Sequence, residues 1–156
     1  MNWPTVLSFV NLFFGGILAG IEIAVHYGFV MPRGLLTEGV QVRLRQSLVL
    51  RLRVLVPAFF VPTVLSGTAV AFLDGAGPGF RVRCAGMIAM SIWIAVRGIA
   101  TVRINSATLT WNPESPPQNW RASVEHAEHF HIAGVWAAVV AFASFLVAAA
   151  LSQTAR

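Results

Sequence analysis

Ionisable side chains lie inside or beside the long apolar stretches of this chain, where such groups are costly and are therefore candidates for function. Glu22 and His26 lie four residues apart in the first apolar stretch, and Arg97 lies within the third. Residues 125–131, just before the last apolar stretch, read Glu-His-Ala-Glu-His-Phe-His. If these groups meet, a buried carboxylate or an imidazole can act as a general base, and an arginine can stabilise an anion.

The composition of the 156-residue chain indicates a membrane protein. Hydrophobic residues make up 56% of it and charged residues only 11%, less than half the share found in a typical soluble domain. All 11 basic residues are arginines, and they lie between apolar stretches instead of on one polar face. This placement favours a membrane surface and disfavours nucleic acid as a partner. The single cysteine, Cys84, excludes an internal disulfide and a cysteine-rich zinc site.

Four stretches are long enough to cross a bilayer, because a helix needs about 20 apolar residues to span about 30 Å. They cover residues 6–30, 54–73, 84–104 and 132–151. We therefore predict an all-α fold, a four-transmembrane-helix up-down bundle that forms a single membrane-embedded domain over residues 1–156. The first stretch could also be read as a signal peptide, but its start carries no positive charge and the apolar run is too long.

The arginines set the expected orientation of the bundle. The connection after the first stretch holds Arg33, Arg43, Arg45, Arg51 and Arg53, and the connection after the third is surrounded by Arg97, Arg103 and Arg121. The positive-inside rule places both connections in the cytoplasm and both termini outside, and we expect the inner membrane of a bacterium. We predict that residues 42–53 form an interfacial helix whose arginines bind lipid headgroups, although their alternating pattern would also fit a strand.

An up-down bundle brings the polar groups to one end of the core. Glu22 lies about 24 Å along the first helix, near its cytoplasmic end, and His26 shares its face. Arg97 and Arg103 lie near the cytoplasmic end of the third helix. A new helix is expected to start near Pro116, and it carries the histidines into the fourth stretch.

Two carboxylate–imidazole pairs at helical spacing could hold a transition metal. Glu125 and His129 are four residues apart, and Glu128 and His131 are three apart. The expected metal ligands are His126, Glu128, His129 and His131, with Glu22 and His26 available from another helix. The second stretch offers no carboxylate or histidine, so a complete di-metal site is not expected. The residues leave three alternatives open: a mononuclear metal site, a haem held between two histidines, or no cofactor.

Several short matches make the chain resemble the anthrone oxygenase family of small membrane proteins. The matches are Gly20-Ile21-Glu22, Phe29-Val30-Met31-Pro32, Asn105, Trp111, Trp120, His131 and the apolar run through Ala141-Phe142. The resemblance implies a four-helix membrane bundle, and members with assigned chemistry use dioxygen to oxidise anthrones to anthraquinones. It carries roles over to Asn105 and His131, and also to Glu22 and Trp120. The arginine expected three residues after the histidine is Gly134 here.

Residues and resemblance together predict an integral membrane oxygenase that uses dioxygen on an activated, apolar aromatic small molecule entering from the lipid bilayer. The expected catalytic residues are Glu22, Arg97, Asn105 and His131, and the expected substrate-binding residues are His26, Arg103, Trp111 and Trp120. Either Glu22 or His131 would remove a proton, and an arginine would favour the resulting anion. The alternatives are a non-catalytic accessory or lipid-binding membrane protein and a small transporter, and the chain could form a homo-oligomer.

Overall fold

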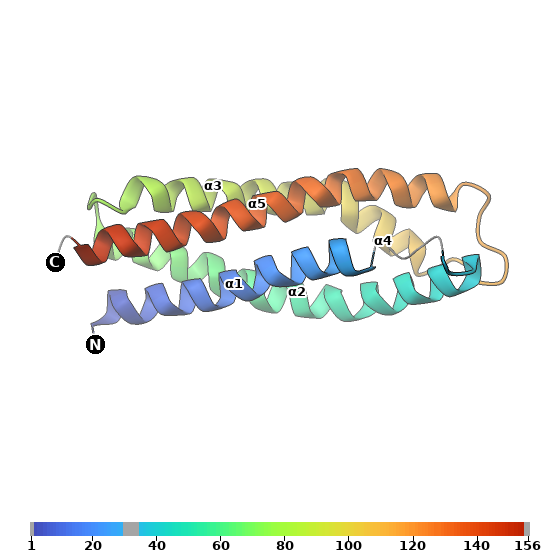
Figure 1. The fold of residues 1–156 in the computed structure, drawn as a ribbon, viewed down its shortest axis with the longest axis horizontal. Coiled ribbons are helices and arrows are strands. Elements are labelled where there is room, and N and C mark those ends of the chain that lie inside the picture. Colours follow the sequence, from blue (N-terminus) through green and yellow to red (C-terminus); the bar gives the residue numbers. More distant parts are fainter. Residues whose placement is uncertain (1, 30–34, 155–156) are drawn as a thin grey trace.

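The computed structural model describes residues 2–29 and 35–154, and within these ranges every regular element is helical (Figure 1). The elements are α1 (Trp3–Phe29), α2 (Glu38–Asp74), α3 (Phe80–Val96), a π-helical turn (Arg97–Thr101), α4 (Val102–Thr108) and α5 (Trp120–Thr154). The predicted all-α fold is therefore confirmed.

Four helical segments are long and apolar enough to cross a membrane. They are α1, α2, the continuous segment Phe80–Thr108 and α5. We call Phe80–Thr108 the third span; it consists of α3, the π-turn and α4. Each segment overlaps one of the four predicted stretches, so the chain has the architecture of a four-helix integral membrane protein.

Successive spans run in opposite directions (Figure 1). α1 starts and α5 ends at one end of the bundle, which we call the termini end. The opposite end, where α2 and α5 begin, carries Arg43 and Arg121, and we call it the arginine end. Exposed ion pairs of Arg43 with Glu114 and of Arg121 with Glu38 connect the start of α2 to the start of α5 and the connection before it. The predicted up-down order is confirmed.

α2 is one continuous helix of 37 residues, much longer than the apolar stretch 54–73. Residues 42–53 belong to its first part, so the predicted helix is confirmed and the strand alternative is wrong. Pro57 and Pro62 lie inside the helix. Because proline has no N–H, each leaves the carbonyl four residues earlier without its helical donor. For Pro57 that carbonyl belongs to Arg53.

The main apolar core joins α1, α3 and α5. Leu18 of α1, Trp93 of α3 and Phe145 of α5 are each at most 2% exposed. α3 and α5 approach closely because Gly86 has no side chain: a Cβ at this position would lie 2.6 Å from a ring carbon of Phe145. Small residues at such contacts are typical of helices that pack inside membranes.

The third span changes direction at the π-turn. Between Arg97 and Thr101 the backbone forms a wider turn than an α-helix, and turns of this kind bend helices and are frequent at functional sites. Beyond it, α4 lies against α2 and α5 (Figure 1). The turn therefore decides where Arg97 and the side chains of α4 lie.

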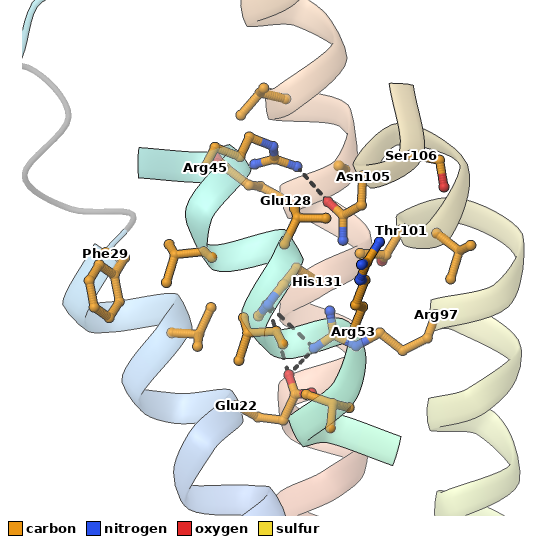
Figure 2. Close-up of a pocket in the computed structure, with 18 of the residues that line it drawn as sticks. Glu22, Phe29, Arg45, Arg53, Arg97, Thr101, Asn105, Ser106, Glu128 and His131 are labelled. Atoms are coloured by element: carbon orange, nitrogen blue, oxygen red, sulfur yellow. Dashed lines mark hydrogen bonds and ion pairs between the residues drawn. The ribbon is translucent and has the colours of Figure 1, made fainter. Parts of the chain in front are cut away.

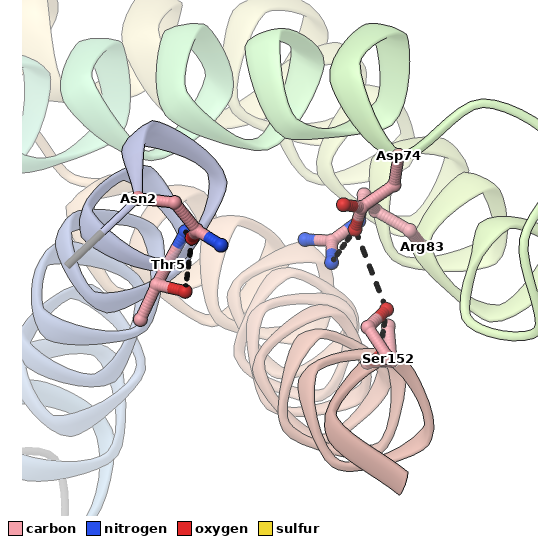
Figure 3. A network of polar contacts seen from close by, with 6 residues as sticks. Asn2, Thr5, Asp74, Arg83 and Ser152 are labelled. Atoms are coloured by element: carbon pink, nitrogen blue, oxygen red, sulfur yellow. Dashed lines mark hydrogen bonds and ion pairs between the residues drawn. The ribbon is translucent and has the colours of Figure 1, made fainter. Parts of the chain in front are cut away.

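A buried ion pair joins three helices at the termini end (Figure 3). Arg83 Nη2 of α3 lies 3.3 Å from Asp74 Oδ2 at the end of α2. Ser152 Oγ of α5 donates to the same oxygen, also at 3.3 Å. The side chain of Arg83 is only 1% exposed, so its charge depends on Asp74 for compensation.

Candidate functional site

A cavity of about 410 Å³ lies at the arginine end between α1, α2, the third span and α5 (Figure 2). Its wall is mainly apolar and includes Phe29, Trp93 and Trp120. Among the described residues, its polar lining consists of Glu22, Gln41, Arg45, Arg53, Arg97, Thr101, Asn105, Ser106, Glu128 and His131. This volume and this mixture of apolar wall and few polar groups are usual for small-molecule sites.

Three polar side chains from three spans meet at the wall of the cavity (Figure 2). Arg97 forms an ion pair with Glu22, and Arg97 Nη2 lies 3.3 Å from His131 Nε2. The same histidine nitrogen lies 3.9 Å from Glu22 Oε2. All three side chains are largely buried, with exposed fractions of 3% for Glu22, 13% for Arg97 and 14% for His131. The first and fourth spans thus place an acid and an imidazole in one pocket, as predicted.

Two neighbours hold the guanidinium of Arg97 in place. The guanidinium carbon lies 5.6 Å from the centre of the Trp93 ring, a cation–π distance. It also packs on Gly134 of α5, where an added Cβ would lie 3.5 Å from Arg97 Nε. The position three residues after His131 is therefore a glycine that leaves room for an arginine supplied by another span.

The contact with Arg97 determines which nitrogen of His131 accepts a hydrogen bond. A guanidinium can only donate, so Nε2 of a neutral His131 accepts and Nδ1 carries the proton. The ring of His26 stacks on that of His131, with centroids 5.5 Å apart and an interplanar angle of 21°. His26 is 8% exposed and does not line the cavity, so it packs against His131 and is not placed to bind a substrate directly.

α2 and α4 build a second polar group on the cavity wall. Arg45 Nη2 donates to Asn105 Oδ1 at 3.1 Å, and Arg45 Nε lies 3.4 Å from Thr108 Oγ1. Gln46 Nε2 donates to the carbonyls of Thr108 at 3.0 Å and Trp111 at 2.9 Å. Because Arg45 engages the amide oxygen of Asn105, the amide nitrogen is the atom that can donate to a bound molecule. Arg45, expected to bind a lipid headgroup, faces the protein instead.

Several buried polar atoms on lining residues have no hydrogen-bond partner in the structure. They are Trp93 Nε1, Arg97 Nε, Thr101 Oγ1 and His131 Nδ1. Buried polar atoms in proteins are nearly always hydrogen-bonded, so each exception calls for an explanation. Their concentration around one cavity is what a site for a ligand with polar groups would show.

The predicted substrate-binding residues divide between the cavity and its surroundings. Trp120 is 6% exposed and lines the cavity, whereas Trp111 packs against the cluster of Val42 and Trp120 outside it. Arg103 is exposed and also lies outside the lining. It precedes Asn105 by two residues, about 200° around a helix, and so faces away from the cavity. The geometry supports substrate contact for Trp120 and gives none to Trp111 or Arg103.

The histidine-rich start of α5 also divides between two faces. Glu128 and His131 line the cavity, as their spacing of three residues allows. His126 and His129 are exposed, and His129 Nδ1 lies 2.8 Å from the carbonyl oxygen of Glu125. Within residues 2–29 and 35–154, no three His, Cys, Asp or Glu side chains come together in a group that could hold a metal ion. The predicted ligand set is therefore split, because successive helical residues point about 100° apart.

Sequence reasoning did not assign several lining residues to this site, namely Gln41, Arg45, Arg53, Trp93, Thr101 and Ser106. The spacing could have identified Trp93, because it precedes Arg97 by four residues and therefore shares its helix face. No sequence pattern could have identified Thr101, because its position depends on the π-turn. Val30, Met31, Pro32 and Arg33, which carried part of the resemblance and of the charge pattern, lie outside the described residues.

Fold and cavity together define a class: a small integral membrane protein whose four-helix bundle encloses a largely apolar cavity with one buried charged cluster. Comparisons of the chain with protein-family models, curated proteins and solved structures found no match.

Proposed function

We propose that this protein is a membrane oxygenase that removes a proton from an activated, apolar aromatic compound of the anthrone type and oxidises it with dioxygen. The observation that supports this most is the cluster of Glu22, Arg97 and His131 at the wall of an apolar cavity. A base beside a cationic donor suits a substrate that becomes an anion. The apolar wall suits a flat ring system, and the resemblance to anthrone oxygenases suggests which ring system.

In this reaction His131 is the general base. At rest its Nε2 accepts from Arg97. A substrate oxygen that gains negative charge would take over the hydrogen bond from Arg97, which leaves Nε2 able to accept the proton. Glu22 Oε2, 3.9 Å away, would then stabilise the imidazolium. The amide nitrogen of Asn105 is a second donor for the charged oxygen.

The chemistry balances with dioxygen as the only co-reactant. Loss of a proton from the CH2 group leaves an anion that gives one electron to dioxygen, and the radical and superoxide combine to a peroxide at that carbon. After protonation of the peroxide, the second C–H proton leaves, the O–O bond breaks and hydroxide departs, which yields a ketone. One anthrone and one dioxygen give one anthraquinone and one water.

We also propose that the arginine end faces the cytoplasm and the termini end faces outward across a bacterial inner membrane. The arginine end carries Arg43 and Arg121. At the termini end the charge of Arg83 is compensated by Asp74. The rule counts arginines and gives acidic partners little weight, so the proposed orientation rests on the larger number of arginines at the arginine end.

Oxygen uptake by the purified full chain in lipid nanodiscs tests the proposed activity. With an anthrone, we expect uptake above the protein-free rate, one dioxygen per anthraquinone, and one isotopically heavy oxygen atom in the new carbonyl when heavy dioxygen is supplied. Asn105→Ala should lower the rate about a hundredfold, because it removes a donor to the developing anion. Asn112→Ala, an exposed residue outside the cavity lining, is the matched control and should leave the rate unchanged. Uptake no faster than without protein would refute the oxygenase and favour the accessory or lipid-binding role.

A further inference from the structure

The cavity opens sideways between α2 and the third span. Among the described residues, and apart from Phe29, the exposed lining residues belong to these two elements: Arg53, Pro57, Ile94, Val102 and Ser106. The lining residues of α5 are all buried or half-buried. We call this opening, bounded by Arg53 and Pro57 on one edge and by Ile94, Val102 and Ser106 on the other, the side portal.

The side portal lies where the apolar surface of the bundle begins. Arg53 is the last charged residue before the apolar stretch 54–73, and Pro57 follows it by about one turn. On the opposite edge Ile94 is 46% and Val102 56% exposed. In a membrane such apolar side chains face lipid, whereas an arginine at the end of an apolar stretch reaches the headgroup level. The portal therefore connects the cavity to the boundary between hydrocarbon and headgroups.

Arg53 brings an uncompensated positive charge to this portal. The deeper Arg97 is paired with Glu22. Within residues 2–29 and 35–154, no carboxylate lies within ion-pair distance of Arg53. Thr101, a lining residue that is 5% exposed, adds an unpartnered hydroxyl to the same cavity. Cation and hydroxyl together suit an acidic group at the entrance of an otherwise apolar pocket.

We propose that the side portal admits a flat apolar acid from the lipid leaflet, that Arg53 binds its carboxylate, and that its ring system lies in the cavity beside Trp93. The cavity volume of about 410 Å³ fits a molecule of a few rings and is too small for a phospholipid with two acyl chains. The acidic group then stays at the headgroup level while the rings reach the cluster of Glu22, Arg97 and His131.

This inference names the substrate class of the proposed oxygenase, but it can be tested without turnover. Anthracene-2-carboxylate is a suitable probe because it is flat and acidic and has no CH2 group from which a proton could be taken. Its methyl ester has the same rings without the charge. A failure of acid recognition and a failure of anthrone oxidation are therefore separate results.

Energy transfer from tryptophan to anthracene measures binding to the full chain in phosphatidylcholine nanodiscs. Trp93 and Trp120 line the cavity and are the nearest donors, so replacing both by Phe should lower the transfer. At equal probe content of the nanodiscs, we expect the acid to bind about tenfold more tightly than the ester, as one charge-assisted hydrogen bond allows. Arg53→Gln should weaken the acid about tenfold and leave the ester unchanged.

Arg51→Gln is the matched control, because Arg51 is exposed on the same helix but lies outside the cavity lining. It should change neither affinity. Equal binding of acid and ester by the wild type, or equal losses in the Arg51 and Arg53 variants, would overturn the proposal. An anionic lipid headgroup is the other possible source of an acidic group, and nanodiscs containing phosphatidylglycerol test it. We expect this lipid not to displace the anthracene acid from the protein. Displacement would assign the site to a lipid headgroup instead.

Discussion

The carboxylate of Glu22 on α1 is ion-paired with the guanidinium of Arg97, 75 residues further along the chain at the first residue of the π-turn. His131 on α5 lies within 4 Å of both partners. Three separate spans thus contribute to one buried cluster, and the apolar bundle has to compensate its charges internally.

Replacing Glu22 by a neutral residue should destabilise the fold, because the buried charge of Arg97 then has no counter-charge. Glu22→Gln leaves the charge of Arg97 buried without a counter-charge, and we expect it to lower the free energy of unfolding by about 3–5 kcal/mol. Glu38→Gln breaks an ion pair with Arg121 that is more than half exposed on both sides, and should cost less than about 1 kcal/mol. Denaturant unfolding in detergent micelles, followed by circular dichroism, measures both. Similar losses in the two variants would show that the Glu22 pair is not buried as described.

Gly134 should matter for function because it makes room for Arg97. A Cβ would lie 3.5 Å from Arg97 Nε, an ordinary contact, so Gly134→Ala should keep the oxidation rate within about twofold. Gly134→Leu should displace the guanidinium and lower the rate more than about tenfold. Gly20→Leu is the control, since a Cβ there meets no atom within 4 Å. The two leucine variants are compared in anthrone oxidation at equal helix content, and equal rates would rule out the packing role of Gly134.

The π-turn should be required for the position of α4. Deleting Gly98 removes the extra residue of the wider turn, so α3 and α4 would join as one straight α-helix without the bend between them. Asn105 would then leave the cavity wall and lose its contact with Arg45. We expect binding of anthracene-2-carboxylate to fall at least about tenfold while the helix content stays the same. Deleting the exposed Gln118 in the connection before α5 is the matched deletion and should preserve binding. Equal binding by both deletion variants would argue against a role for the turn.

The ion pair at the termini end should support stability without affecting the chemistry. Asp74→Asn leaves Arg83, 1% exposed, without its counter-charge, and should destabilise the fold by about 3–5 kcal/mol. Arg81→Gln, an exposed neighbour, should have little effect. Below the unfolding transition both variants should oxidise anthrone at the wild-type rate, because Asp74 lies at the termini end and the cavity at the arginine end of the bundle (Figure 1). A rate loss in folded Asp74→Asn would show that the two ends are coupled.

The helices and the convergence of the polar groups could be predicted from the sequence. Distance along an apolar helix was enough to place Glu22, and the reversal of direction between spans placed His131 at the same end. The π-turn could not be predicted, because no proline marks it and its wider register shows only in the folded backbone.

The sequence indicated less clearly which arginines of α2 face the protein and which face away from it. The alternating pattern in residues 42–45 suggested one role for all of them, lipid anchoring. In a helix, however, Arg45 shares a face with Gln41, Leu48 and Leu52, and all four line the cavity. The predicted helix over residues 42–53 already implies this face, but the prediction gave all of its arginines the same role.

The most direct measurement compares anthrone oxidation by His131→Ala and His129→Ala. The two histidines lie two residues apart on α5, one in the cavity lining beside Glu22 and Arg97 and the other exposed. If His131 is the base, its loss should lower the rate at least about a hundredfold, and the His129 variant should stay within about twofold of the wild type. Equal rates in the two variants would contradict a catalytic role for the cluster that His131 forms with Glu22 and Arg97.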